Sequence, residues 1–282
     1  MEQYPSLIKQ HKPQSNEIWY HYCSAESFMD IIKNKTLRLT DLRHMNDMEE
    51  LILGERLLNE LLETEEKGEY IRAIYDFFKP QIIQLSMSFS ENIDQLSQWR
   101  GYADDARGFC IGFKAENFNK LPVHLLKVEY QISEQKKLIR NAINKIVTYL
   151  SDIQQTNTIN FESALLIAEL FELFSILKNN SFREEKEYRL VYAIFVDEKN
   201  GGKLIDFNKK KESYKDCIEN INFRLVDNVP TPFVDLKYNT LAPISQIVIG
   251  PKNQSKESDI KTFISTNGMY NIKITKSSST YR

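Results

Sequence analysis

The sequence predicts an α+β protein with a mixed, largely antiparallel sheet and an inserted helical segment. Segments rich in β-branched and aromatic residues, typical of strands, occur in both the first and the last third of the chain. A leucine-rich helical pattern separates them, from about 133 to 178. This order differs from the regular strand–helix alternation of a wound parallel sheet. Because no Pro/Gly/Ser-rich linker interrupts the 282 residues, we expect one domain over 1–282 with a helical insertion at 133–178.

The elements expected before the insertion begin with an aromatic strand at 18–23 (IWYHYC). Ser24 then occupies the N-cap position of a helix at 25–34. In the strand at 82–89 apolar residues alternate with serines, which places the serines on one face. The other elements expected in this part are a strand at 36–40, helices at 48–66, 70–78 and 94–102, and strands at 109–113 and 128–130.

After the insertion, the segment 187–196 (EYRLVYAIFV) has the clearest strand pattern in the chain. It starts with charged residues and then becomes apolar, as expected for a strand that enters the core from a polar edge. The remaining elements expected are strands at 223–226, 233–236, 246–249 and 270–275, and a helix at 257–265.

Composition excludes several classes of protein. The formal net charge of -2 lacks the basic excess of a non-specific nucleic-acid binder. The three cysteines lie far apart and form no Cys-x-x-Cys pair, which indicates a reducing compartment and no zinc site. The first residues lack the apolar core of a signal peptide, and no apolar run reaches the length of a membrane span. We therefore expect a cytoplasmic protein that uses neither membrane nor metal.

Phosphate-binding glycine motifs are absent from the chain: it contains neither G-x-G-x-x-G nor G-x-x-x-x-G-K-[ST]. Candidate functional residues lie instead in three short polar segments, YHYCS, SFSE and EEKEYR. His21 lies within a strand, either as a hydrogen-bonded core residue or as a partner of a ligand hydroxyl. Glu187 and Arg189 share a strand face, either as a surface ion pair or as charged groups at the mouth of a cleft.

Two further segments carry polar side chains of the right type for a ligand site. Ser86, Ser88 and Ser90 form a row of hydroxyls that faces either solvent or a cleft. On the short helix at 94–102, Trp99 has the character of a core residue, whereas Arg100 and, in the turn that follows, Arg107 are candidates for contact with a phosphate.

Several motifs in a fixed order resemble an uncharacterised bacterial family, a domain of unknown function. They are YHYCS, N-x-x-L-R-L, MND-x-E at 45–49, SFSE, W-x-x-YA, GFCIGF, EKEYR and IVIGP, which together extend from about 18 to 251. That family in turn resembles the ADP-ribosyltransferase superfamily, including the DarT type of DNA-modifying toxin. The likeness lies in a strand that carries a histidine, followed by a helix and a short strand.

The resemblance implies an ADP-ribosyltransferase-like fold and NAD as the substrate, with no metal. Carried over, His21 holds the adenosine ribose, and Glu187 holds the nicotinamide ribose and stabilises the positive charge that develops when nicotinamide leaves. The aromatic side chain that stacks on nicotinamide is one of Tyr20, Tyr22, Phe89 and Tyr102. The residues expected to bind NAD are His21, Tyr22, Ser88, Phe89, Ser90, Arg100, Tyr102 and Arg189.

The expected function is therefore transfer of ADP-ribose to a protein or nucleic-acid acceptor, or cleavage of NAD, in a toxin or anti-phage defence effector. Two alternatives remain open. One is a non-catalytic nucleotide-binding or antitoxin-like regulatory module. The other is a metal-dependent nuclease that uses Glu185, Glu187 and an upstream acid such as Asp94.

Overall fold

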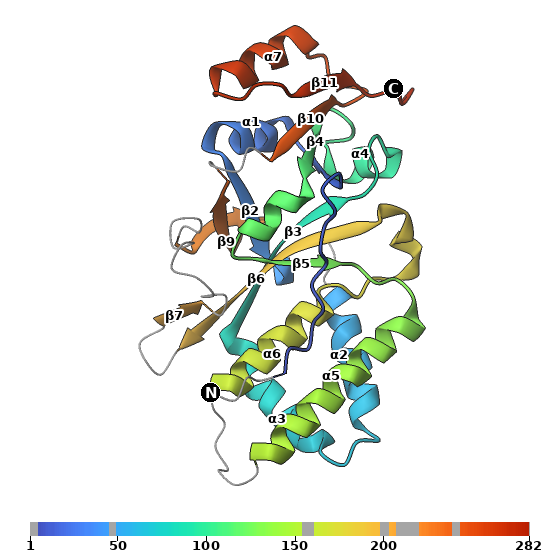
Figure 1. The fold of residues 1–282 in the computed structure, drawn as a ribbon, viewed down its shortest axis with the longest axis vertical. Coiled ribbons are helices and arrows are strands. Elements are labelled where there is room, and N and C mark those ends of the chain that lie inside the picture. Colours follow the sequence, from blue (N-terminus) through green and yellow to red (C-terminus); the bar gives the residue numbers. More distant parts are fainter. Residues whose placement is uncertain are drawn as a thin grey trace.

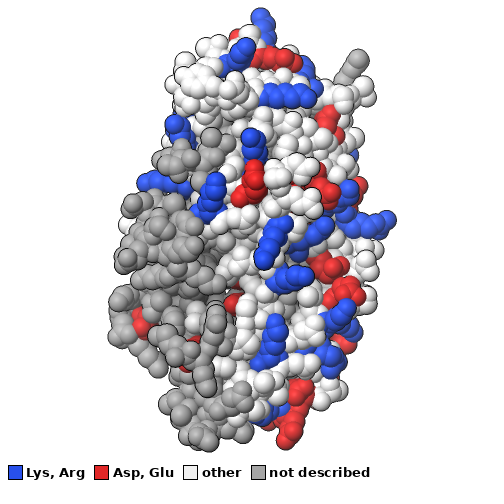
Figure 2. All heavy atoms as spheres, viewed as in Figure 1, with Lys and Arg blue, Asp and Glu red and all other residues white. Residues whose placement is uncertain are grey.

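The computed structural model describes residues 5–44, 49–153, 161–197, 203–206, 220–238 and 243–281. A large sheet crosses the middle of the molecule, with a group of helices at one end and a smaller helix at the other (Figure 1). Positive and negative side chains are interspersed over the described part of one face, in keeping with the nearly balanced charge (Figure 2).

The described strands form one sheet in which most neighbours are antiparallel. Along its main path the order is β11-β10-β4-β1-β3-β2-β9-β8. Off this path, β6 pairs with β3, and β5 and β7 each pair with β6. Only the β10–β11 pair is parallel among these strands. The strands are β1 (Ile18–Cys23), β2 (Thr36–Asp41), β3 (Ile82–Ser90), β4 (Phe109–Lys114), β5 (His124–Lys127), β6 (Glu187–Asp197), β7 (Lys203–Asp206), β8 (Asn222–Val226), β9 (Val229–Lys237), β10 (Ile244–Ile249) and β11 (Lys273–Lys276).

Strand β3 has a central place in the sheet, because two different strands, β1 and β2, pair with the same edge of it. Its other edge pairs with β6 over all nine residues. On the shared edge, β1 pairs at Ser90 and β2 pairs at Ser86 and Leu85. Between these contacts β1 and β2 separate, and the edge of β3 near Ser88 has no strand partner on that side.

The helices cover the sheet on both faces. Helix α1 connects β1 to β2 and packs Phe28, Ile31 and Ile32 into one core with α7. Four other helices, α2, α3, α5 and α6, pack together against the opposite face of β3 and β6 (Figure 1). The helices are α1 (Ala25–Asn34), α2 (Glu49–Leu62), α3 (Gly68–Phe78), α4 (Leu96–Tyr102), α5 (Ile132–Ile153), α6 (Phe161–Phe174) and α7 (Glu257–Thr266), with short 3-10 turns at Leu42–His44, Lys79–Gln81, Ala115–Lys120 and Asn180–Glu185.

The structure confirms the predicted α+β class and the largely antiparallel sheet. Helices α5 and α6 lie where the sequence predicts the insertion, between β5 and β6. One prediction is wrong in detail, because the strand expected at 128–130 lies instead at His124–Lys127. Strand β7 has no counterpart among the expected elements. The MND segment at 45–48, and with it the start of the helix expected from 48, falls outside the described residues.

None of the described helices combines the length and the apolar character needed to cross a lipid bilayer.

Gly54 on α2 tests the packing of the helical layer. A Cβ at this position would fall inside van der Waals distance of the Phe174 ring on α6. We expect Gly54→Ala to lower the free energy of unfolding by about 1–3 kcal/mol in urea denaturation, because overpacking exceeds the gain in helix propensity. Gly101 on α4 is the control, since a Cβ there meets nothing within 4 Å. If Gly54→Ala is as stable as Gly101→Ala, α2 and α6 are not packed in this way.

Candidate functional site

A pocket of about 360 Å³ opens where β1 and β2 separate along β3. Its walls come from β1, α1, β2, β3, α4, β6, β8 and β9, together with Lys178 and Glu185, which precede β6. Sequence segments that are far apart thus meet at one gap in the sheet. The serine-bearing strand β3 forms the floor, because its edge near Ser88 is where the strand pairing is interrupted.

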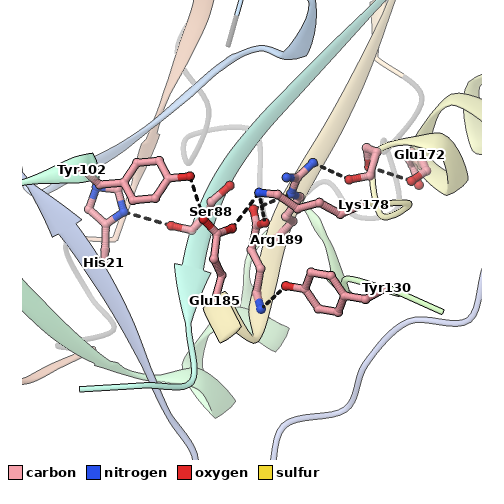
Figure 3. Close-up of polar contacts among 10 residues, drawn as sticks. His21, Ser88, Tyr102, Tyr130, Glu172, Lys178, Glu185 and Arg189 are labelled. Carbon is pink, nitrogen blue, oxygen red and sulfur yellow. Dashed lines mark hydrogen bonds and ion pairs between the residues drawn. The ribbon is translucent and has the colours of Figure 1, made fainter. Parts of the chain in front are cut away.

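His21 lies on β1 at one side of this gap. Its Nδ1 is 2.9 Å from the carbonyl oxygen of Ser88 (Figure 3). Burial lowers the pKa of His21 and outweighs the hydrogen bond to Ser88, so the ring is neutral at pH 7. A carbonyl can only accept, so Nδ1 must donate its proton and Nε2 is left as an acceptor. Among the described residues Nε2 has no partner, and it is available to a ligand hydroxyl.

Glu187, the first residue of β6, belongs to a buried network of four charged side chains. Lys178 Nζ lies 2.7 Å from Glu185 Oε2 and 3.0 Å from Glu187 Oε2. Arg189 Nε donates to Glu187 Oε1 at 2.7 Å, and a second guanidinium nitrogen donates to the Ser175 carbonyl. Figure 3 shows these groups together beside β3 and β6. Within these contacts each positive side chain lies against a carboxylate, which makes their joint burial tolerable.

The backbone brings both carboxylates to Lys178. Lys186 lies between them in the left-handed region, with φ of 42°, at the end of a 3-10 turn. Glu185 therefore ends the turn and Glu187 begins the strand, and both side chains reach the same ammonium group. Tyr130 fixes the strand start by accepting a hydrogen bond from the Glu187 backbone at 2.9 Å.

The charge state of Glu187 follows from its partners. Burial alone would raise its pKa, but Arg189 and Lys178, with a smaller effect of the Ser88 hydroxyl, lower the pKa to about 2. Glu187 is thus a carboxylate at neutral pH, and its charge is already shared by two cations.

Three other predicted residues that line the pocket are held in place by contacts within the protein, two by hydrogen bonds and one by packing. Ser90 donates to the Glu185 carbonyl at 2.6 Å, and so ties β3 to the turn before β6. The Tyr22 hydroxyl donates to the Asn92 carbonyl. Phe89 packs among Trp19 and other rings in the core. Their contribution to the site is mainly its shape.

Tyr102 is the most exposed of the aromatic residues that line the pocket. Its side chain belongs to a residue that is 43% exposed, and its hydroxyl donates to Glu185 Oε1 at 3.0 Å. Arg100, on the same helix, does not line the pocket and lies instead over the Tyr281 ring. The pocket thus brings together the predicted residues His21, Tyr22, Ser88, Phe89, Ser90, Tyr102, Glu187 and Arg189.

Several pocket residues were not among the predicted site residues. Lys178 follows an apolar helical run, and no local motif marks it as a partner of Glu187. Arg38 and Asp235 form a two-point ion pair of 2.8 and 2.9 Å across β2 and β9. Ser86 and Arg224 also line the pocket. Of these, only Ser86 carried a signal, because it belongs to the predicted row of serines.

The nuclease alternative finds little support in the geometry. Within the described part of the chain, no three His, Cys, Asp or Glu side chains are grouped as metal ligands. Glu185 and Glu187 both bind Lys178, whereas Asp94 accepts from Trp99 and from Ser277 and Ser278 near the C-terminus. The acids proposed for the metal therefore belong to two separate networks.

Comparison with known proteins gives one match. Residues 98–190 match a family model described as protein of unknown function (DUF2971). This stretch includes Tyr102, Lys178, Glu185, Glu187 and Arg189, so it covers the charged side of the pocket, and it ends before β8 and β9. No curated protein and no solved structure matches the chain.

The depressed pKa of Glu187 predicts a loss of stability in acid. The unfolded value is 4.5 and the folded value about 2, so the unfolded state takes up the proton first as pH falls. The contribution of Glu187 is complete above about pH 5 and is lost progressively between pH 4.5 and about 2. In urea denaturation at pH 7 and pH 3, we expect wild type to lose on the order of 2 kcal/mol more than Glu187→Gln. Equal losses in the two proteins would contradict this ion pairing.

Proposed function

We propose that this chain is an NAD-dependent ADP-ribosyltransferase-like protein that binds NAD in the pocket between β1 and β2. The observation that carries the proposal is that His21, Ser88 and Glu187, from three different strands, line the same pocket. In the proposed reaction the bond between nicotinamide and ribose breaks. ADP-ribose then passes to a protein or nucleic-acid acceptor, or to water, as expected for a toxin or anti-phage defence effector.

The proposed role of His21 follows from its tautomer. In the neutral imidazole, Nδ1 donates a hydrogen bond to the Ser88 carbonyl, and Nε2 is left as an acceptor. A ribose hydroxyl is a suitable donor to this nitrogen. Of the four aromatic candidates for stacking on nicotinamide, Tyr102 is best placed, because it is exposed, whereas Phe89 and Tyr22 are buried and Tyr20 is partly buried.

Glu187 is the proposed electrostatic group. When nicotinamide leaves, positive charge develops on the anomeric carbon of the ribose, and a fixed carboxylate beside it lowers the barrier. Arg189 and Lys178 hold the carboxylate in one orientation. No proton transfer to Glu187 is required, which is consistent with a group that stays ionised down to about pH 2.

A second candidate function is nucleotide binding without cleavage, in a regulatory module. It is favoured by one specific feature, the pairing of Glu187 with both Lys178 and Arg189. A carboxylate whose charge is already compensated stabilises a developing cation less than a free one does. The same pocket and the same His21 contact serve this function.

Nicotinamide release from NAD by the purified protein tests the proposal. We expect release by wild type and a rate at least about a hundredfold lower in Glu187→Gln, while calorimetry shows NAD binding by both. Glu60→Gln is the matched control, because Glu60 is exposed and pairs only with Lys136 among the described residues. Circular dichroism verifies that each variant is folded.

The other outcomes separate the two candidates. Binding of NAD without release of nicotinamide would favour the regulatory module. Absence of NAD binding in a folded wild-type protein would contradict both. Release that persists in Glu187→Gln would remove Glu187 from the proposed mechanism.

A further inference from the structure

The β8 side of the pocket contains a cation that forms no ion pair with any carboxylate in the described part of the chain. Arg224 lines the pocket, and its Nη2 makes one long hydrogen bond of 3.4 Å to Thr40 Oγ1. Within the described residues it forms no ion pair. Arg38, two residues before Thr40 on β2, differs, because both oxygens of Asp235 bind it. Arg224 therefore lines the pocket with a positive charge that no carboxylate of the described residues binds directly, although the charge of Asp235 lies near enough to favour it.

Ser86 provides a second, independent feature of the same region. It is 1% exposed and lines the pocket, yet its Oγ has no hydrogen-bond partner in the described structure. A buried hydroxyl without a partner is unfavourable and uncommon in proteins. Ser86 lies directly opposite Thr40 in the β2–β3 pair, so the two hydroxyls share one face of the sheet.

We infer that Arg224, Thr40 and Ser86 form an anion subsite that binds a phosphate group of the ligand. The two hydroxyls and the guanidinium supply hydrogen-bond donors, and phosphate oxygens are acceptors that suit all three. The inference rests on the proposed function only for the identity of the ligand as a nucleotide; the subsite itself follows from these three side chains.

The electrostatics of the surroundings agree with an anion at this position. Burial, followed by the charge of Arg38, lowers the pKa of Arg224, and the charge of Asp235 opposes this shift without cancelling it. Of the nearby carboxylates, Asp235 is engaged by Arg38 and Asp30 lies exposed on α1. A bound phosphate would offset the repulsion between the two guanidinium groups.

The position of the subsite also sets the direction of the ligand. His21 lies on β1, whereas the anion subsite lies on β2, on β8 and at the end of β3 that pairs with β2, so the two are on opposite sides of the gap. A ligand that contacts both crosses the exposed edge of β3 near Ser88. A nucleoside diphosphate has this combination of a ribose hydroxyl and phosphates on one chain.

The test uses inorganic pyrophosphate, without divalent metal, in thermal unfolding and calorimetry. We expect pyrophosphate to stabilise wild type, and its dissociation constant to rise about tenfold or more in Arg224→Gln, as for loss of a charge-assisted hydrogen bond. Ser86→Ala is expected to unfold at a temperature no lower than wild type without ligand, but to bind pyrophosphate more weakly. Arg107→Gln is the matched control, since Arg107 is exposed and pairs with Asp104 outside the pocket.

Either of two results would overturn the subsite: no binding of pyrophosphate to wild type, or equal binding to wild type and Arg224→Gln. Pyrophosphate contains neither nicotinamide nor ribose, so this outcome is independent of NAD cleavage. Binding that depends on Arg224 in a protein that releases no nicotinamide would support the subsite and count against the transferase activity alone.

Discussion

The pocket depends on one constraint, the sharing of a single edge of β3 by two strands. Pairing with β6 is continuous along the other edge and holds β3 in one position. Strand β3 therefore cannot shift to pair along its whole length with either β1 or β2. The pairings at Ser90 and at Ser86 fix the two strands at opposite ends of the shared edge. The backbone between them is exposed to the pocket, and the imidazole of His21 occupies part of the gap by bonding the Ser88 carbonyl. A ligand site inside a continuous sheet results from this interruption.

The buried charge network joins this gap to the helical layer. Lys178 follows α6, while Glu187 and Arg189 belong to β6, so their ion pairs connect a helix end to a strand. Removing one member of such a network leaves an uncompensated buried charge, which costs about 3–5 kcal/mol in proteins. The same contacts that hold the carboxylate in place also compensate its charge. The ion pairs that orient Glu187 therefore also weaken the field that its carboxylate exerts on a ligand. How far they weaken this field decides between a transferase and a binding module.

Much of the fold could be predicted from the sequence because its signals are local. The alternation of serines in β3 predicted that they share one face, and the period of a strand predicted that Glu187 and Arg189 share another. The partners of these residues could not be predicted in the same way. Lys178 carries no pattern that distinguishes it from a surface lysine, and Arg224 meets Thr40 across 184 residues of sequence. Such pairings exist only after the sheet has formed, since the order of its strands differs from the order of the chain.

Hydrogen exchange of the backbone in the presence of NAD tests the central claim most directly. If NAD binds in the gap between β1 and β2, exchange should slow in the β3 segment around Ser88 and in β1 around His21, with α3 in the distant helical layer as the internal control. Slower exchange confined to other segments, or no change at saturating NAD, would contradict the assignment of this pocket as the nucleotide site.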